Sequence, residues 1–126
     1  MTAVEGLSAL ARDHLENPRG RDAFPPDVPG EISRGEAGSA ASGAFLRFCL
    51  RIVEGRIVQA RYEVLGPPEL MAAASWFSES LIGRRVAADA VPPGMEAARA
   101  LELPRATHGL TLLAEDAVRA ALKCAL

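Results

Sequence analysis

The side chains of this chain that could perform chemistry are few. It holds two cysteines, Cys49 and Cys124, and two histidines, His14 and His108. Thiolates and imidazoles bind zinc and iron–sulfur clusters, and a closed site of either kind takes four ligands. The two cysteines lack the close spacing of a zinc ribbon or of a dithiol redox motif. Taken alone, these residues predict no metal site.

Catalytic arrangements are equally sparse. Ser42, His108 and an acid such as Glu69 are the residue types of a nucleophile, a base and an orienting group, but neither their spacing nor their flanking sequence supports that assignment. The glycine-rich segments lack the Gly-Lys-Ser/Thr of a phosphate-binding loop. We therefore assign no catalytic residue and expect a protein that is not an enzyme.

Composition restricts the class of protein further. The chain has 126 residues, a formal net charge of −2, a sequence pI of about 5.7 and 49% hydrophobic residues. This charge balance gives no basic footprint for nucleic acid, and no apolar stretch is long enough to span a bilayer. Glu5 lies where a signal peptide would be basic and then apolar. We expect one domain over residues 1–126, in a reducing cytoplasm, without disulfides.

Two alternating runs of residues predict a β-hairpin. In 46–53 and again in 57–65, apolar residues alternate with mostly charged ones, and Glu54-Gly55 joins the two runs. In the second run, Val58 and Ala60 are assigned to the apolar face. A short edge strand over 31–36 would complete a small, three-stranded antiparallel sheet. One face of that sheet needs a cover of helices.

Helical spacing of apolar residues predicts the helices that cover the sheet. An N-terminal helix is expected over 2–16 with Thr2 as its cap, followed by a proline- and glycine-rich loop over 17–30. Further helices are expected over 68–82 and 95–101, and a long amphipathic helix from residue 110 onward. The predicted fold class is α+β, with an N-terminal helix and a C-terminal helical layer on the sheet.

Several landmarks, in this order, carry a resemblance to a known family. They are the run Asp13-His14-Leu15-Glu16-Asn17-Pro18-Arg19, the pair Tyr62 and Gly66, the helix segment Ala72-Ala73-Ala74-Ser75, the turn Glu102-Leu103-Pro104, and His108 followed by Leu113-Ala114-Glu115-Asp116-Ala117. Together they resemble the NifU N-terminal/IscU-type iron–sulfur cluster assembly scaffolds, over nearly the whole chain. The resemblance implies the NifU/IscU-like α+β fold.

The resemblance also implies where a cluster would be held. Such scaffolds use three cysteines and one aspartate, and at those positions this chain has Ser42, Ala44, Pro67 and Gly109. Only His108 remains as a weak candidate for a metal ligand. We therefore expect no cofactor, although the family as a whole handles an iron–sulfur cluster, iron or zinc.

By resemblance, a cysteine desulfurase loads such scaffolds and a chaperone helps to release the cluster. The expected function is that of a partner-binding or regulatory paralogue that does not ligate a cluster itself, with homo-oligomers as an option. Two alternatives stay open: iron or a cluster bound through His108, carboxylates or a second chain, and reuse of the vacated site as a small-molecule or catalytic pocket. The expected partner-binding residues are Asp13, His14, Asn17, Pro18, Arg19, Leu103, Pro104 and Arg105.

Overall fold

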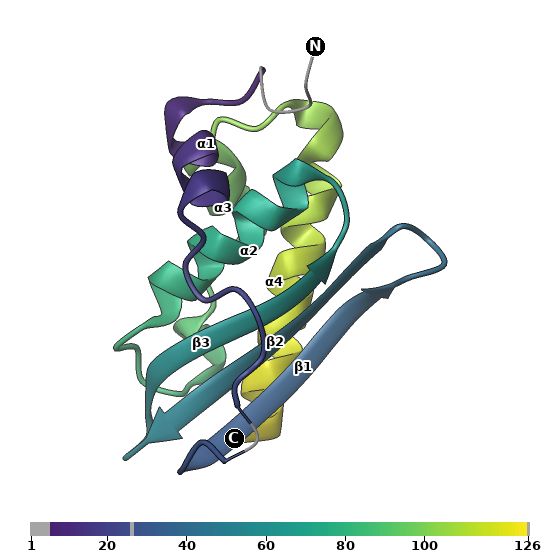
Figure 1. The fold of residues 1–126 in the computed structure, drawn as a ribbon. Helices are drawn as coiled ribbons and strands as arrows, with labels where there is room; N and C mark the ends of the chain where they lie inside the picture. Colours follow the sequence, from purple (N-terminus) through teal and green to yellow (C-terminus); the bar gives the residue numbers. More distant parts are fainter. Residues whose placement is uncertain (1–5, 26, 126) are drawn as a thin grey trace.

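A three-stranded antiparallel sheet forms the centre of the molecule (Figure 1). The computed structural model describes residues 6–25 and 27–125. Its strands are β1 (Glu31–Ser39), β2 (Ala44–Val53) and β3 (Arg56–Leu65), in the order β1-β2-β3. Because each connection is a tight turn, both pairs are antiparallel, as the alternating runs predict.

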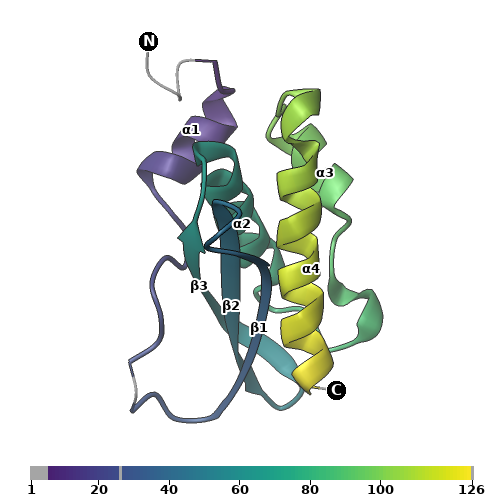
Figure 2. The same cartoon turned by 90° about the vertical axis from the view of Figure 1, so that its right-hand side faces the viewer.

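Helices cover one face of this sheet, which confirms the predicted α+β class. They are α1 (Ala9–Glu16), α2 (Pro68–Leu81), α3 (Gly94–Ala100) and α4 (His108–Ala125), with the short 3-10 turns η1 (Ala88–Ala90) and η2 (Arg105–Thr107) between them. The long helix α4 lies along β1 and β2, while the segment between α1 and β1 crosses the opposite face of the sheet (Figure 2). We call this crossing segment, residues 17–30, the strap.

The start of the first helix differs from the prediction. Thr2 lies outside the described residues, and the cap of α1 is Ser8, whose Oγ accepts a hydrogen bond from the Ala11 N–H at 3.2 Å. The same hydroxyl donates to the Leu101 carbonyl at 2.6 Å, which joins α1 to the end of α3. A serine cap of this kind is worth about 1 kcal/mol relative to alanine.

An irregularity in the β2–β3 pairing overturns one predicted face. Ile52 pairs with Ile57, yet Arg51 pairs with Gln59, so Val58 is an extra residue on β3. Such a bulge shifts the in-out alternation by one position. As a result Ile57 is buried and Val58 is exposed, and the assignment of Val58 to the apolar face is wrong.

Strand β1 is longer than the expected 31–36, because Ala37, Gly38 and Ser39 also pair with β2. Gly35 lies against α4, where a Cβ atom would be only 2.0 Å from the Ala121 nitrogen. Ser33 donates a hydrogen bond from its buried hydroxyl to the Ala121 carbonyl on the same helix. Small residues in β1 therefore let a helix approach the sheet at backbone distance.

The cysteines do not lie where the pattern placed them. The alternation along the strand predicts a half-covered Cys49 thiol on the polar face, but Cys49 is almost fully buried, and burial raises the pKa of its thiol. The helical spacing predicts Cys124 inside the apolar arc of the last helix, but Cys124 is exposed near the end of α4. Among the described residues, no helix is both long and apolar enough to cross a membrane.

Candidate functional site

The run from Asp13 to Arg19 ties the end of α1 to α2. The Arg19 guanidinium bonds to Asp13 at 2.6 Å and to Glu79 of α2 at 2.9 Å, and it donates to the Asn17 carbonyl at 3.0 Å. The Asn17 amide donates to the other Asp13 oxygen at 2.9 Å. These polar groups therefore hold the strap at its start, and the pKa of the Asp13 carboxyl is lowered, chiefly by Arg19.

His14 belongs to this run but lies inside the molecule. Its ring is 1% exposed, and Nδ1 lies 2.7 Å from the hydroxyl of Ser75 in α2. The sequence predicts a helix-end histidine bonded to a carbonyl; that prediction is wrong, because the helical period turns His14 toward α2. Its Nε2 is buried without a hydrogen-bond partner among the described residues.

Ser75 connects three segments that are far apart in the sequence. Its hydroxyl contacts His14, accepts the Arg19 backbone N–H at 2.9 Å, and is hydrogen-bonded to Tyr62 of β3. Tyr62 and Ser75 are both among the sequence landmarks, but nothing in the local pattern predicts that they meet. Burial raises the pKa of the Tyr62 hydroxyl, an effect that the bond with Ser75 opposes.

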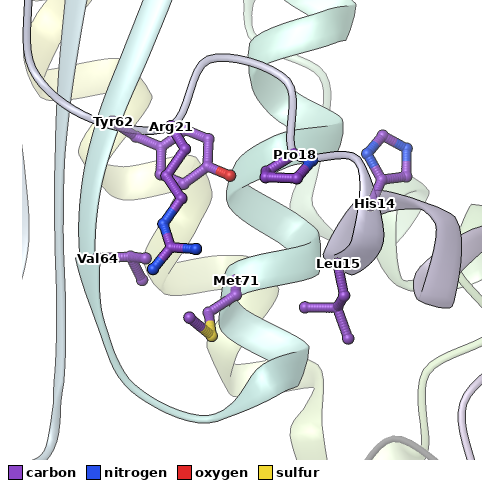
Figure 3. A pocket seen from close by; sticks show the side chains of 7 residues that line it. All are labelled: His14, Leu15, Pro18, Arg21, Tyr62, Val64 and Met71. Carbon is purple, nitrogen blue, oxygen red and sulfur yellow. The ribbon is translucent and has the colours of Figure 1, made fainter.

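A small cavity lies beside this cluster (Figure 3). Its volume is about 20 Å³, which is room for about one water molecule. The Tyr62 hydroxyl turns toward Pro18 at its rim, while apolar side chains make up much of the wall. The lining residues are His14, Leu15, Pro18, Arg21, Tyr62, Val64 and Met71. A cavity of this size holds no organic substrate.

The buried His14 predicts a loss of stability in mild acid. Burial, with a smaller effect from Arg19, lowers the pKa of His14, while Asp13 and Glu79 oppose the shift. As the pH falls through about 6.5, the ordinary value, the unfolded chain therefore binds a proton that the folded chain does not. We expect the free energy of unfolding to fall from pH 7 to pH 5, and His14→Asn to remove most of this slope. Urea unfolding at several pH values measures it.

The carboxylates with shifted pKa values do not contribute to the slope between pH 7 and pH 5. The pKa values of Asp13 and Glu115 are lowered from ordinary values of 3.8 and 4.5, so the stability that these groups contribute is lost only at lower pH. An unchanged slope between pH 7 and pH 5 in His14→Asn would assign the acid sensitivity to another group.

Two loops are in contact, and α4 packs nearby, at the end of the sheet that the resemblance assigns to the cluster. Ser42 lies in the exposed β1–β2 turn, where its hydroxyl donates to the Ser39 carbonyl at 2.9 Å. A Cβ on Gly66, after β3, would lie 3.5 Å from the Gly43 oxygen and 3.7 Å from the Ala44 Cα. The turn and the start of α2 are thus in contact, and Pro67 is exposed beside them.

The start of α4 is the third of these segments. A Cβ on Gly38 of β1 would lie 3.0 Å from Leu113 of α4, which brings the first turns of the helix to the β1–β2 turn. Gly109 is exposed, with open space around its Cα. His108 is half-buried, and its Nε2 lies 3.0 Å from the Leu103 carbonyl. Because a carbonyl only accepts hydrogen bonds, Nε2 carries the proton and Nδ1 keeps a lone pair.

The side chains at these positions carry few atoms that could coordinate a metal ion. Alanine, proline and glycine carry no ligand atom, which leaves the Ser42 hydroxyl and the His108 imidazole. The described residues contain no group of three or more His, Cys, Asp or Glu side chains placed to hold a metal ion. Ligands for a cluster at this end of the sheet would have to come from elsewhere.

The remaining predicted partner residues differ in exposure. Asn17, Pro18, Pro104 and Arg105 are exposed, whereas Leu103 is 6% exposed and packs in the core. Glu115, one of the family landmarks, accepts the Gly94 N–H at 2.6 Å and pairs with Arg119 at 2.8 Å. It thereby holds the start of α3 against α4, a role that sequence spacing does not predict.

The domain is an α+β fold with a three-stranded antiparallel sheet covered on one face by helices, and comparisons with known proteins identify its family. Residues 8–124 match the family model of the NifU-like N terminal domain. An iron–sulfur cluster assembly protein 1 of Oryza sativa subsp. japonica is 33% identical over 126 residues, covering 96% of this chain and 73% of that protein. The chain belongs to the NifU-like N terminal domain family.

Other relatives and a solved structure support the same family and fold. The iron–sulfur cluster assembly scaffold protein IscU of Azotobacter vinelandii is 31% identical over 115 residues, which cover 88% of this chain and 87% of that protein. A relative from Kluyveromyces lactis, 28% identical over 88% of this chain and 62% of its own length, is named as mitochondrial. The crystal structure of a NifU-like protein from Brucella abortus superimposes with a TM-score of 0.62 at 20% identity, covering 92% and 91% of the two chains.

Family membership corrects one expectation. We expected no cofactor, from Ser42, Ala44, Pro67 and Gly109 at the ligand positions; that expectation is wrong for this family, whose members are iron–sulfur cluster assembly scaffolds. The expectation rested on the residue types at four positions alone. Membership of the family implies instead that a cluster is handled, as cargo.

Proposed function

We propose that this chain serves iron–sulfur cluster assembly chiefly by binding other assembly proteins, as a non-catalytic, partner-binding or regulatory member of its family. The observation that carries the proposal is the contrast between two parts of the molecule. The loops at Ser42 and Pro67 are in contact at one end of the sheet, near α4, but they and Gly109 present hardly any ligand atoms, while the run from Asp13 to Arg19 keeps a complete polar network. We also propose that residues 1–126 make one domain and that it works in the cytoplasm.

The proposed partner surface consists of the exposed residues Asn17, Pro18, Pro104 and Arg105. Both of its segments are anchored from within: Ser75 binds the Arg19 backbone, and the Leu103 carbonyl accepts from His108. A loop with a fixed shape loses less conformational entropy when a partner binds. In this proposal the buried His14 and Leu103, together with Asp13 and Arg19, act by fixing that shape.

A binding measurement with a cysteine desulfurase tests this proposal. Titration calorimetry of the purified chain with the desulfurase from the same cell is expected to show binding, weakened about tenfold in Arg105→Glu because a charge is reversed within the contact. Lys123→Glu makes the same charge change on an exposed residue near the other end of α4 and is expected to bind like the wild type. Absence of wild-type binding, or equal loss in both variants, would contradict the proposed surface.

One observation favours a second candidate function, the handling of iron or a cluster shared with another chain. His108 keeps a lone pair on Nδ1, because its Nε2 proton is held by the Leu103 carbonyl. Anaerobic reconstitution with iron and sulfide, followed by mass measurement and metal counting, is expected to give a metal-containing dimer that His108→Ala loses. Metal bound to a monomer would contradict ligands from a second chain.

Reuse of the vacated site as a catalytic or small-molecule pocket gains no support. Two hollows lie in the region of the strap, and a third lies at the end of α4. None of these three is lined by Ser42, Ala44, Pro67 or Gly109.

A further inference from the structure

The sheet face opposite α4 carries a group of arginines. In the strand register Arg34 of β1 pairs with Cys49 of β2, which pairs with Arg61 of β3, and Arg51 lies two residues along β2 on the same face. Arg34 is exposed, while Arg51 and Arg61 are half-buried under the strap. We call Arg34, Arg51, Arg61 and the neighbouring Arg21 the arginine face.

Two of the carboxylates on these strands are paired with another arginine. Glu36 and Glu63 both bond to Arg47, at 2.7 Å and 3.4 Å. The arginine face itself makes only uncharged contacts within residues 6–25 and 27–125: Arg51 donates to the Pro29 carbonyl at 2.8 Å, and Arg61 lies 5.5 Å from the centre of the Phe24 ring. Such contacts orient a guanidinium without cancelling its charge.

A hollow of about 320 Å³ opens beside the arginine face, along the edge of β3. This volume is at the lower end of the range for ligand pockets. No carboxylate lines it, and Ile82, which is 49% exposed, gives it one apolar wall. The lining residues are Pro18, Gly20, Arg21, Gln59, Ala60, Arg61 and Ile82.

More positive charge continues along the same edge. Arg56 donates to the Gly83 carbonyl at 3.1 Å and Arg84 to the Ser80 carbonyl at 2.7 Å, so both are positioned without an ion pair. Arg85 is bridged to Arg56 through the backbone. The nearby acids are Asp22, Glu54 and Glu79, and Glu79 is already paired with Arg19. The edge is therefore net positive in a chain whose formal charge is −2.

We propose that the arginine face docks an acidic segment of a partner protein, with an aspartate or glutamate side chain in the hollow between Arg21 and Arg61 and an apolar neighbour on Ile82. Guanidinium groups bind carboxylates through two parallel hydrogen bonds, which a lysine cannot reproduce. Thirteen of the fourteen basic residues of the chain are arginines. A nucleic acid fits less well, because the chain as a whole is acidic and repels a long polyphosphate.

This inference goes beyond the proposed function, since it concerns a different partner chemistry, and of the proposed partner surface only Pro18 lines the hollow. The test uses a fluorescein-labelled peptide of ten residues that alternates glutamate with leucine and alanine, followed by fluorescence anisotropy at low salt. We expect the double variant Arg21→Gln/Arg61→Gln to bind this peptide about tenfold more weakly than the wild type, from the loss of two charge-assisted contacts. Arg99→Gln/Lys123→Gln, which removes two exposed charges on α3 and α4, is the matched control and is expected to change binding less than about twofold.

Both double variants are first compared with the wild type by circular dichroism, because Arg61 is half-buried and contacts Phe24 of the strap, and an intact fold must be established before binding is compared. Equal weakening in the two double variants would overturn the proposal, since it would show attraction to charge anywhere on the surface. Tighter binding of a single-stranded oligonucleotide of equal charge, lost in Arg21→Gln/Arg61→Gln, would overturn it in favour of a nucleic acid partner. Weaker binding of the oligonucleotide than of the peptide supports the docking of an acidic segment.

Discussion

Replacing Gly35 with alanine is expected to lower the free energy of unfolding by about 3 kcal/mol or more, at the upper end of the range for overpacked cores. The added Cβ would lie 2.0 Å from the Ala121 nitrogen and 2.5 Å from the Ala120 carbonyl carbon. Both atoms belong to the backbone of α4, so no side-chain rotation relieves the clash. The helix must move off β1, and the hydrogen bond from Ser33 to the Ala121 carbonyl breaks with it.

Gly109→Ala is the matched control for this experiment. It makes the same chemical change within α4, but no atom lies within 4 Å of the added Cβ. Alanine is the better residue in a helix, by about 0.5–1 kcal/mol over glycine, so this variant is expected to be slightly more stable than the wild type. Urea unfolding followed by circular dichroism measures both. Equal stability of the two variants would contradict the close approach of β1 and α4.

Local sequence patterns predict the elements of this fold better than their exact faces. The alternation in 46–53 and 57–65 predicts the hairpin, and Glu54 and Gly55 at its turn both have positive φ, 52° and 74°, as a tight two-residue turn requires. The bulge escapes prediction because Ile57 and Val58 are both apolar, and either could face the core. Pairing with β2 decides between them, and pairing is not a local property.

In the candidate site, too, local sequence patterns do not predict contacts between distant segments. Helical spacing places His14 on the inner side of its helix, but its hydrogen-bond partner Ser75 lies 61 residues away, so the buried polar tie cannot be inferred from spacing. Leu103 was expected to contact a partner because a family motif carries it. Its side chain is instead part of the core, and only the neighbouring Pro104 and Arg105 reach the surface. A motif identifies a segment, whereas packing decides which of its atoms a partner can touch.

Placing three cysteines and one aspartate at the four positions that the resemblance assigns to the family ligands is expected to raise the iron and sulfide bound per chain by about tenfold over the wild type, because three thiolates and a carboxylate hold a cluster far better than one imidazole. The variant is Ser42→Cys/Ala44→Asp/Pro67→Cys/Gly109→Cys. The structure readily allows three of the changes: Ser42 lies in an exposed turn, Gly109 has open space, and Pro67 caps α2 without a side-chain hydrogen bond. The fourth residue, Ala44, is half-buried at the start of β2. Pro68 still begins the helix.

Anaerobic reconstitution with iron and sulfide measures this effect, read as visible absorption and as iron counted per chain. The control places the same residue types, three cysteines and one aspartate, at exposed positions on four different elements: Ala9→Asp, Val58→Cys, Arg99→Cys and Asp116→Cys. It separates a built site from adventitious iron on surface thiols, since a site needs its ligands at one point in space. If the restored variant binds no more iron than this control, then the turn after β1, the start of α2 and the start of α4 do not converge closely enough to hold a cluster. A clear excess over the control would mean that the scaffold geometry is intact and that this chain differs from its relatives there in side chains alone.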